Sequence, residues 1–144
     1  MNTQVEFLLL KSSEQLTRLA IRKLTELYQS NERVLVLADK RIQLERMDEL
    51  LWHNSDKQFI TYSLDSECYA FSTAVLLTDN QPKNIRYRAL LNMGEQLPEK
   101  PEQFRNIIEL VATDEDAVEK AREHYKIYRH LGFSISHQQL TSEE

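Results

Sequence analysis

The sequence predicts an α/β fold in which helices flank a mostly parallel central sheet, giving three layers. Short apolar runs typical of buried strands, such as Arg33 to Ala38, alternate with segments whose apolar residues recur at helical spacing. The order strand, helix, strand, helix at these intervals indicates parallel strands joined by crossover helices. The chain of 144 residues suffices for one domain with a sizeable core, so we expect a single domain over 1–144.

The first half of the chain is expected to form two strands and two helices. Gln4 to Leu10 predicts the first strand, and a helix capped by Ser12 or Ser13 then extends to about Gln29. Arg33 to Ala38 predicts the second strand. The second helix follows it, and its apolar residues are Ile42, Leu44, Met47, Leu50 and Leu51.

The second half is less regular until its last strand. Residues 53–73 are polar, with one extended piece expected near Phe59 to Tyr62. Further strands are expected at Ala74 to Thr78, at Ile85 to Met93 and at Asn106 to Ala112.

The final helix is expected to span Asp114 to Leu131, with Thr113 as its cap. Gly132 ends it, and Phe133 folds back against Tyr128 as the hydrophobic part of a glycine C-cap. Residues from about 138 to 144 are expected to form a polar, mobile tail.

Two faces of this helix follow from a rotation of about 100° per residue. One face is expected to join the core and carries Ala117, Ala121, Tyr128 and Leu131. A second stripe borders it and carries Val118, Arg122, Tyr125 and Arg129, with Lys126 beside them. Two arginines next to an aromatic ring, with no acid among them, suit a short acidic or carboxylate-ended partner. The alternative is an ordinary solvated face whose arginines pair with nearby glutamates.

Composition excludes several classes of function. The 18 Lys and Arg against 23 Asp and Glu give a net charge of -5, which argues against general nucleic-acid binding. Gly94 and Gly132 are the only glycines, too few for a phosphate-cradling loop, so no nucleotide cofactor is expected. The longest apolar run covers five residues, so no segment predicts a membrane span. One cysteine, Cys68, and no export signal predict a cytoplasmic protein without internal disulfides.

The remaining candidate residues predict neither catalysis nor metal binding. Trp52 ends the second helix and is either a core anchor or a contact point for a partner protein. The four histidines lack metal-ligand spacing, and Cys68 has no Cys-x-x-Cys partner. No serine lies in a Gly-x-Ser-x-Gly elbow. We therefore expect no catalytic residues, no metal site and no enzyme activity.

The chain resembles the chi-subunit family of bacterial DNA polymerase III over nearly its whole length. One motif behind the resemblance is Met47-Asp48-Glu49-Leu50-Leu51-Trp52, followed by Phe59. The other is Ala121-Arg122-Glu123-His124-Tyr125-Lys126-Ile127-Tyr128-Arg129, followed by Gly132-Phe133. The family has a Rossmann-like α/β layout, which agrees with the order of strands and helices predicted above.

The resemblance implies a non-catalytic adaptor of the clamp loader with two protein-binding sites. It implies that Trp52 and Phe59 face the psi subunit, and that a helicase related to the XPD family competes with psi for that surface. It also implies binding of the acidic C-terminal tail of single-stranded-DNA-binding protein, which ends in a phenylalanine with a free carboxylate. The implied tail-binding residues are Arg122, Tyr125, Lys126 and Arg129, with Val111 lining the pocket.

The chain departs from the family at one position of the tail site. The family can carry a basic residue one turn before the residue matching Arg122, and Val118 stands there in this chain. On this interpretation nucleic acid is reached only indirectly, through the coating protein. Two alternatives stay open: a nucleotide-dependent enzyme on a Rossmann-like sheet, and a direct single-strand binder that uses the stripe as a stacking groove.

Overall fold

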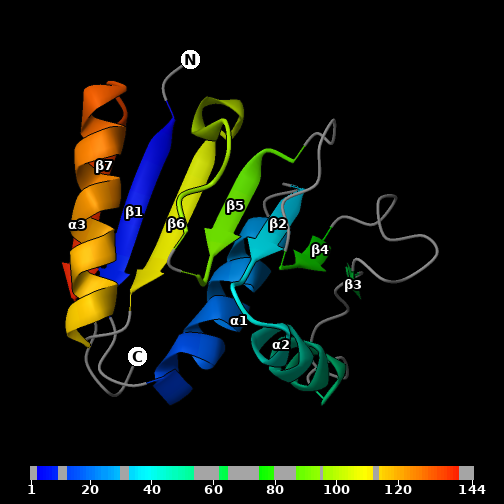
Figure 1. The fold of residues 1–144 in the computed structure, drawn as a ribbon. Coiled ribbons are helices and arrows are strands. Elements are labelled where there is room, and N and C mark those ends of the chain that lie inside the picture. The colour runs from blue at the N-terminus through cyan, green and yellow to red at the C-terminus, as the bar shows by residue number, and fades with distance from the viewer. Residues whose placement is uncertain are drawn as a thin grey trace.

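The computed structural model describes residues 3–9, 13–29, 33–53, 62–64, 75–79, 87–94, 96–111 and 114–139. Figure 1 shows how the strands and helices are arranged. In chain order they are β1 (Gln4–Leu9), α1 (Ser13–Gln29), β2 (Val34–Leu37), α2 (Arg41–His53), β3 (Tyr62–Leu64), β4 (Val75–Thr78), β5 (Ala89–Asn92), the short 3-10 helix η2 (Pro101–Gln103), β6 (Asn106–Val111), α3 (Glu115–His130) and β7 (Ser134–Gln139).

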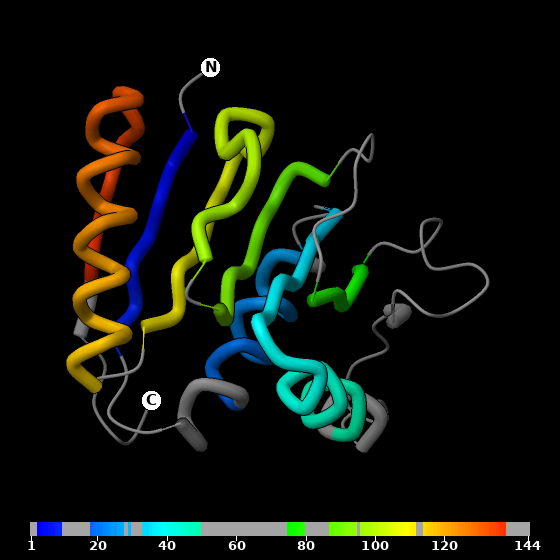
Figure 2. Tube along the Cα trace, in the orientation of Figure 1, coloured from blue at the N-terminus to red at the C-terminus, as the bar shows by residue number. Residues whose placement is uncertain are grey.

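The described strands form one seven-stranded sheet in the order β3-β4-β2-β5-β6-β1-β7. Every neighbouring pair is parallel, so the expectation of a mostly parallel sheet is confirmed. The first and last strands lie side by side although they come from opposite ends of the chain (Figure 2). In register, Val5 of β1 is opposite Ile107 of β6 on one side and Ile135 of β7 on the other.

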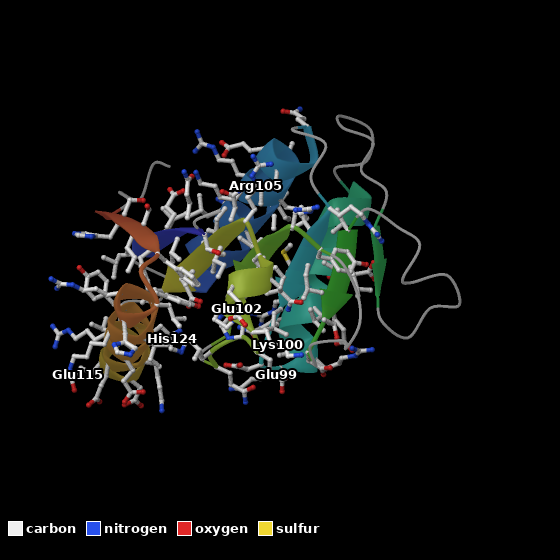
Figure 3. The ribbon with its side chains drawn as sticks, turned by 90° about the horizontal axis from the view of Figure 1, so that it is seen from above. Glu99, Lys100, Glu102, Arg105, Glu115 and His124 are labelled. Atoms are coloured by element: carbon white, nitrogen blue, oxygen red, sulfur yellow. The ribbon has the colours of Figure 1, made fainter. Side chains whose placement is uncertain are left out.

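Helices cover both faces of the sheet, which confirms the three-layer architecture. Helices α1 and α2 pack on one face, while α3 and the connection between β5 and β6 lie on the other (Figures 1 and 3). Successive side chains of β6 point to opposite faces of the sheet, so the strand contributes to the apolar cluster on each face. Ile108 and Leu110 belong to the apolar cluster under α1 and α2, whereas Ile107 and Val111 belong to the cluster under α3.

Two expected strands and one expected core residue differ from those observed. The strand expected over Ile85 to Met93 is limited, within the described residues, to β5. The extended piece expected at Phe59 to Tyr62 overlaps β3 only at Tyr62, and Phe59 lies outside the described residues. Ile42, expected in the apolar set of α2, is 51% exposed. It lies about 200° round the helix from the buried Leu44, so the two residues cannot share a face.

The seventh strand was not predicted. We expected a mobile tail from about residue 138, but β7 extends to Gln139 and pairs with β1. Its sequence, Ser-Ile-Ser-His-Gln-Gln, has one apolar residue and therefore carries little strand signal. The strand is stabilised by its pairing with the apolar strand β1, because its own sequence has little preference for a strand.

None of the described helices has the length and apolar character needed to cross a membrane.

Candidate functional site

Helix α3 begins at a well-formed cap. Asp114, and not the expected Thr113, is the N-cap residue: its Oδ2 accepts a hydrogen bond from the backbone N–H of Ala117 at 3.2 Å. Glu115 and Asp116 follow in the first turn, where the positive end of the helix dipole favours acids. The cap is thus one residue later than expected, and it fixes where the helical faces begin.

The other end of α3 closes as the sequence predicted. The N–H of Gly132 donates to the carbonyl of Arg129, and the N–H of Phe133 donates to the carbonyl of Tyr128, both at 3.1 Å. Gly132 has a φ of 82°, which favours glycine, and the rings of Tyr128 and Phe133 stack with centroids 5.9 Å apart. The predicted C-cap is confirmed, so α3 is fixed at both ends.

The face of α3 toward the sheet carries one residue that the prediction missed. Ala117 and Tyr128 are buried and Ala121 is partly buried, as expected. Leu131, expected in the core, is 46% exposed because it lies beyond the last helical turn, at the C-cap position. The fourth core position belongs to His124, which is buried. Its spacing from Ala117 and Ala121 is that of one helical face, so the sequence did contain the signal.

The stripe of basic and aromatic residues borders this buried face. Arg122, Lys126 and Arg129 are exposed, and the Tyr125 side chain is 37% exposed. Val118 is partly buried and packs against the apolar cluster under α3. The structure therefore brings these five residues onto one border of a fixed helix.

Neighbouring residues affect the packing and the local charge of this stripe. The ring of Tyr125 lies against that of Phe7 in β1, with centroids 6.2 Å apart, so it has an apolar support beneath it. Arg122 lines a shallow hollow together with Glu115, Val118 and Glu119. The expected absence of acids holds along the stripe itself, but two glutamates stand beside its amino end. The excess of positive charge is therefore toward Lys126 and Arg129.

The other candidate residues lie elsewhere or outside the described residues. Val111 is 5% exposed and borders a different hollow, with Ala117, Ala121 and His124, rather than the hollow of Arg122. Trp52 belongs to the last turn of α2, although its side chain is not among those described. Phe59 lies outside the described residues.

Beneath α3 lies a buried polar network centred on Glu109 of β6. The Glu109 side chain is buried, and its Oε1 lies 3.0 Å from Nδ1 of His124. Its Oε2 accepts from the Tyr128 hydroxyl at 2.8 Å and from Nδ2 of Asn92 at 3.0 Å. An ionised carboxylate can only accept, so Nδ1 of His124 carries the proton in this contact. Three donors satisfy a charge that would otherwise be costly to bury.

Asn92 extends the network to the connection that follows β5. Its Nδ2 also donates to the carbonyl of Gln96 at 2.9 Å, and its Oδ1 accepts from the N–H of Gly94 at 3.0 Å. One carboxylate thus links β6, helix α3 and the chain after β5. A single acid inside the apolar run Ile107-Ile-Glu-Leu-Val was the available sequence signal.

Two buried tyrosines make the free energy of unfolding depend on pH in the alkaline range. Burial raises the pKa of Tyr128 far above its usual value, and the adjacent Glu109 carboxylate raises it further. Burial also raises the pKa of Tyr87, which is partly offset by the guanidinium of Arg33 at 4.8 Å from the ring. Both hydroxyls therefore keep their protons in the folded chain at pH values at which an unfolded tyrosine ionises.

We expect the free energy of unfolding to fall above about pH 10, where the unfolded tyrosines lose protons that the folded chain retains. Each such group contributes a slope of about 1.4 kcal/mol per pH unit. Tyr128→Phe should be less stable at pH 7, because the hydrogen bond to Glu109 is lost, but less sensitive between pH 10 and 11. Urea unfolding at pH 7, 10 and 11 measures both effects. Tyr87→Phe is the comparison, and equal slopes in wild type and both variants would contradict the expectation.

The stripe offers features that suit the binding of a partner. His124 and Glu109 form a buried pair beneath the helix, and the stripe lies on its exposed border. No group of three or more His, Cys, Asp or Glu suited to holding a metal occurs in the part of the chain that the structure describes. Exposed cations, a supported tyrosine ring and a rigid helix are the features that the stripe offers.

Comparison with known proteins identifies relatives of one kind. A family profile described as "DNA polymerase III chi subunit, HolC" matches residues 2–136. DNA polymerase III subunit chi of Haemophilus influenzae is 28% identical over 111 residues, covering 76% of this chain and 77% of that protein. The subunit of the same name from Escherichia coli is 26% identical over 112 residues, covering 77% and 76%.

Solved structures show a shared fold. Domain 2 of the DEAD-box helicase Mss116p, bound to an RNA duplex, has a TM-score of 0.63 at 13% identity. The match covers 97% of this chain but 65% of that one. A chain in the structure of the E. coli DEAD-box protein SrmB bound to regulator of ribonuclease activity A has a TM-score of 0.56 at 15% identity, covering 99% and 94%. At these identities the likeness concerns the Rossmann-like fold alone.

Proposed function

Because the chain belongs to the chi-subunit family of DNA polymerase III, we propose that it is a non-catalytic adaptor of the replicative holoenzyme. In this proposal it joins the clamp loader, through the psi subunit, to the acidic tail of single-stranded-DNA-binding protein in the cytoplasm. The observation that carries the proposal is the exposed border of α3, with Arg122, Tyr125, Lys126 and Arg129 on a helix fixed at both ends.

The chemistry of this border suits a peptide that ends in a phenylalanine with a free carboxylate. An arginine side chain can hold a carboxylate through two parallel hydrogen bonds, and we assign this role to Arg122. Tyr125 and Val118 offer an apolar surface for the phenylalanine ring. Lys126 and Arg129 attract the acidic residues that precede it. Glu115 and Glu119 oppose that attraction near Arg122, which favours a weak contact that is quickly released.

The psi-binding surface is proposed for the end of α2, with Trp52 and Phe59. Trp52 lies in the last turn of α2, and α2 and α3 lie on opposite faces of the sheet (Figure 1). Such separation would let the chain hold psi and the tail at the same time, as an adaptor requires. A helicase related to the XPD family would compete with psi for the same surface, so one chain would hold one or the other.

A peptide titration tests the tail site directly. A fluorescent acidic peptide ending in Asp-Ile-Pro-Phe should bind with a free energy of about 7–9 kcal/mol, equivalent to a micromolar dissociation constant. Amidation of its C-terminal carboxylate should weaken binding at least about tenfold, because Arg122 loses its charged acceptor. Fluorescence anisotropy in low and moderate salt measures both constants. If the free acid fails to bind at tens of micromolar in low salt, the stripe is an ordinary solvated face.

A further inference from the structure

Three arginines lie side by side at the end of the sheet where the strands begin. Arg33 directly precedes β2, Arg88 precedes β5 and Arg105 precedes β6. These strands are neighbours in the sheet, and their registers place the three arginines opposite one another. The backbone N–H of Arg88 donates to the carbonyl of Arg33 at 3.2 Å, and that of Arg105 donates to the carbonyl of Arg88 at 2.7 Å. We call these three residues the arginine row.

The arginine row brings like charges together without a balancing anion. Neighbouring strands lie about 4.8 Å apart, and like charges opposite each other on such strands are destabilising. The side chains of Arg88 and Arg105 are exposed, and they form no ion pair or hydrogen bond within the part of the chain that the structure describes. Both guanidinium groups are therefore available to an anion outside the chain.

Buried aromatic residues fix the backbone from which the row extends. Tyr87 precedes Arg88 and Phe104 precedes Arg105, and these two aromatic residues are 3% and 2% exposed. The guanidinium carbon of Arg33 lies 4.8 Å from the centroid of the Tyr87 ring. Because both rings are buried, they offer no surface on which the bases of a single strand could stack. The row thus suits charged groups and not bases.

Positive charge exceeds negative charge around the row. Within three positions of its members the sequence holds one further arginine, Arg86, and two acids, Glu32 and Glu102, so the local sum is four positive charges against two negative. Arg86 and Glu32 lie outside the described residues. Figure 3 views the molecule from this end and labels Glu102 on the side that α3 covers, apart from Arg105. An acidic ligand is therefore complementary to the row, although the whole chain has a net charge of -5.

The positive end of the stripe on α3 lies at the same end of the sheet. Helix α3 runs antiparallel to the strands, so its last turn, which contains Arg129, is next to the start of β7 (Figure 1). Hydrogen bonds then link the strand starts: the N–H of Ser134 donates to the carbonyl of Thr3 at 3.1 Å, and the N–H of Gln4 donates to the carbonyl of Arg105 at 2.9 Å. The row therefore begins two strand spacings, or about 10 Å, from the start of β7.

We infer that the arginine row is a second contact surface for the acidic tail, and that it binds acidic residues further from the tail's terminus than those held by the stripe. The inference rests on the proposed tail site at Arg122. Arg122 and Arg129 are about 10 Å apart along α3, and the row covers the interval from about 20 to 30 Å. An extended peptide spans these distances with about six to nine residues. The net charge of -5 opposes a long polyanion such as nucleic acid more strongly than it opposes a short acidic peptide.

Peptides of two lengths test the inference by fluorescence anisotropy. The short peptide is Asp-Ile-Pro-Phe, the long acidic peptide has six further aspartates before it, and the long neutral peptide has six serines in their place. In low salt the long acidic peptide should bind at least about fivefold more tightly than the other two, because it alone reaches the row with negative charge. This gain should shrink as salt is added.

Substitutions in the row locate the gain. Arg88→Ser combined with Arg105→Ser should abolish the gain of the long acidic peptide and change binding of the short peptide by less than about twofold. Arg18→Ser combined with Arg22→Ser removes the same charge from two exposed positions of α1 and is the matched control, in which the gain should persist. Thermal unfolding should be unchanged in both double variants, because the substituted side chains are exposed.

Three outcomes would overturn the inference: no gain of the long acidic peptide over the neutral one, a gain that survives the double substitution in the row, or an equal loss in the α1 control. A thymidine oligonucleotide that binds through Arg88 and Arg105, without any length effect of the peptides, would assign the row to nucleic acid instead. Failure of the proposed tail site gives a different result, because the short peptide would then bind equally to the wild type and to Arg122→Ala. Failure of the row alone leaves that difference intact.

Discussion

Replacing Glu109 by alanine is expected to lower the free energy of unfolding by about 3–5 kcal/mol. The change removes the acceptor shared by His124, Tyr128 and Asn92, and all three donors are buried. Asn92 keeps its hydrogen bond to the carbonyl of Gln96, but the Tyr128 hydroxyl and Nδ1 of His124 lose their partner inside the protein and pay the cost of burial without a hydrogen bond. For a domain with a typical stability of about 5–15 kcal/mol, the loss is a large share of the whole. Urea unfolding followed by circular dichroism measures it.

Two further variants show whether the loss of stability comes from the lost hydrogen bonds or only from the smaller side chain. Glu109→Gln keeps the shape and one carbonyl acceptor, so it should cost clearly less than Glu109→Ala, although its amide nitrogen then faces a donor. Glu102→Ala removes an exposed acid of η2 and should change stability by less than about 0.5 kcal/mol. Equal stability of Glu109→Ala and wild type would mean that the three donors find other partners, and the network would then not hold α3 in place.

The fold was predictable because its signals are local and repeated. Four buried residues in a row in β2, and the helical spacing of Leu19, Ala20 and Leu24 in α1, specify buried elements without reference to the rest of the chain. Strand β7 was missed because its stability comes from pairing with β1, more than a hundred residues earlier. The cap of α3 was placed one residue too early because Thr113 and Asp114 are both good capping residues.

The candidate site likewise has parts that the sequence predicts and parts that it does not. The stripe follows from helical spacing alone, so Arg122, Tyr125 and Arg129 could be grouped from the sequence. The polar network needs β5, β6 and α3 to meet, and the sequence gives no direct sign of that meeting beyond an acid in an apolar strand. A hollow beside α3 is lined by the segment after β2, the segment after β5 and one border of α3. No periodicity in the sequence links those segments, so this hollow was not predictable.

Replacing Arg122 by alanine is expected to weaken binding of the Asp-Ile-Pro-Phe peptide at least about thirtyfold, or about 2 kcal/mol. The proposed carboxylate anchor is lost, and neither Lys126 nor Arg129 can form the same paired hydrogen bonds from its own position on the helix. Because Arg122 is exposed, the fold should be unchanged. Anisotropy titration gives the affinity, and thermal unfolding by circular dichroism confirms that the fold is intact.

A control variant that removes the same charge elsewhere shows whether the effect of Arg122→Ala depends on its position. Arg22→Ala removes an exposed arginine from α1, which packs on the opposite face of the sheet, and should reduce peptide affinity by less than about twofold. Trp52→Ala should leave peptide binding intact and weaken binding of psi, whereas a Trp52 buried in the core would appear as lost stability instead. If Arg22→Ala and Arg122→Ala weakened the peptide equally, its attraction would be a general effect of charge. In that case the adaptor proposal would rest on the surface around Trp52, and the border of α3 would have no anchor for a terminal carboxylate.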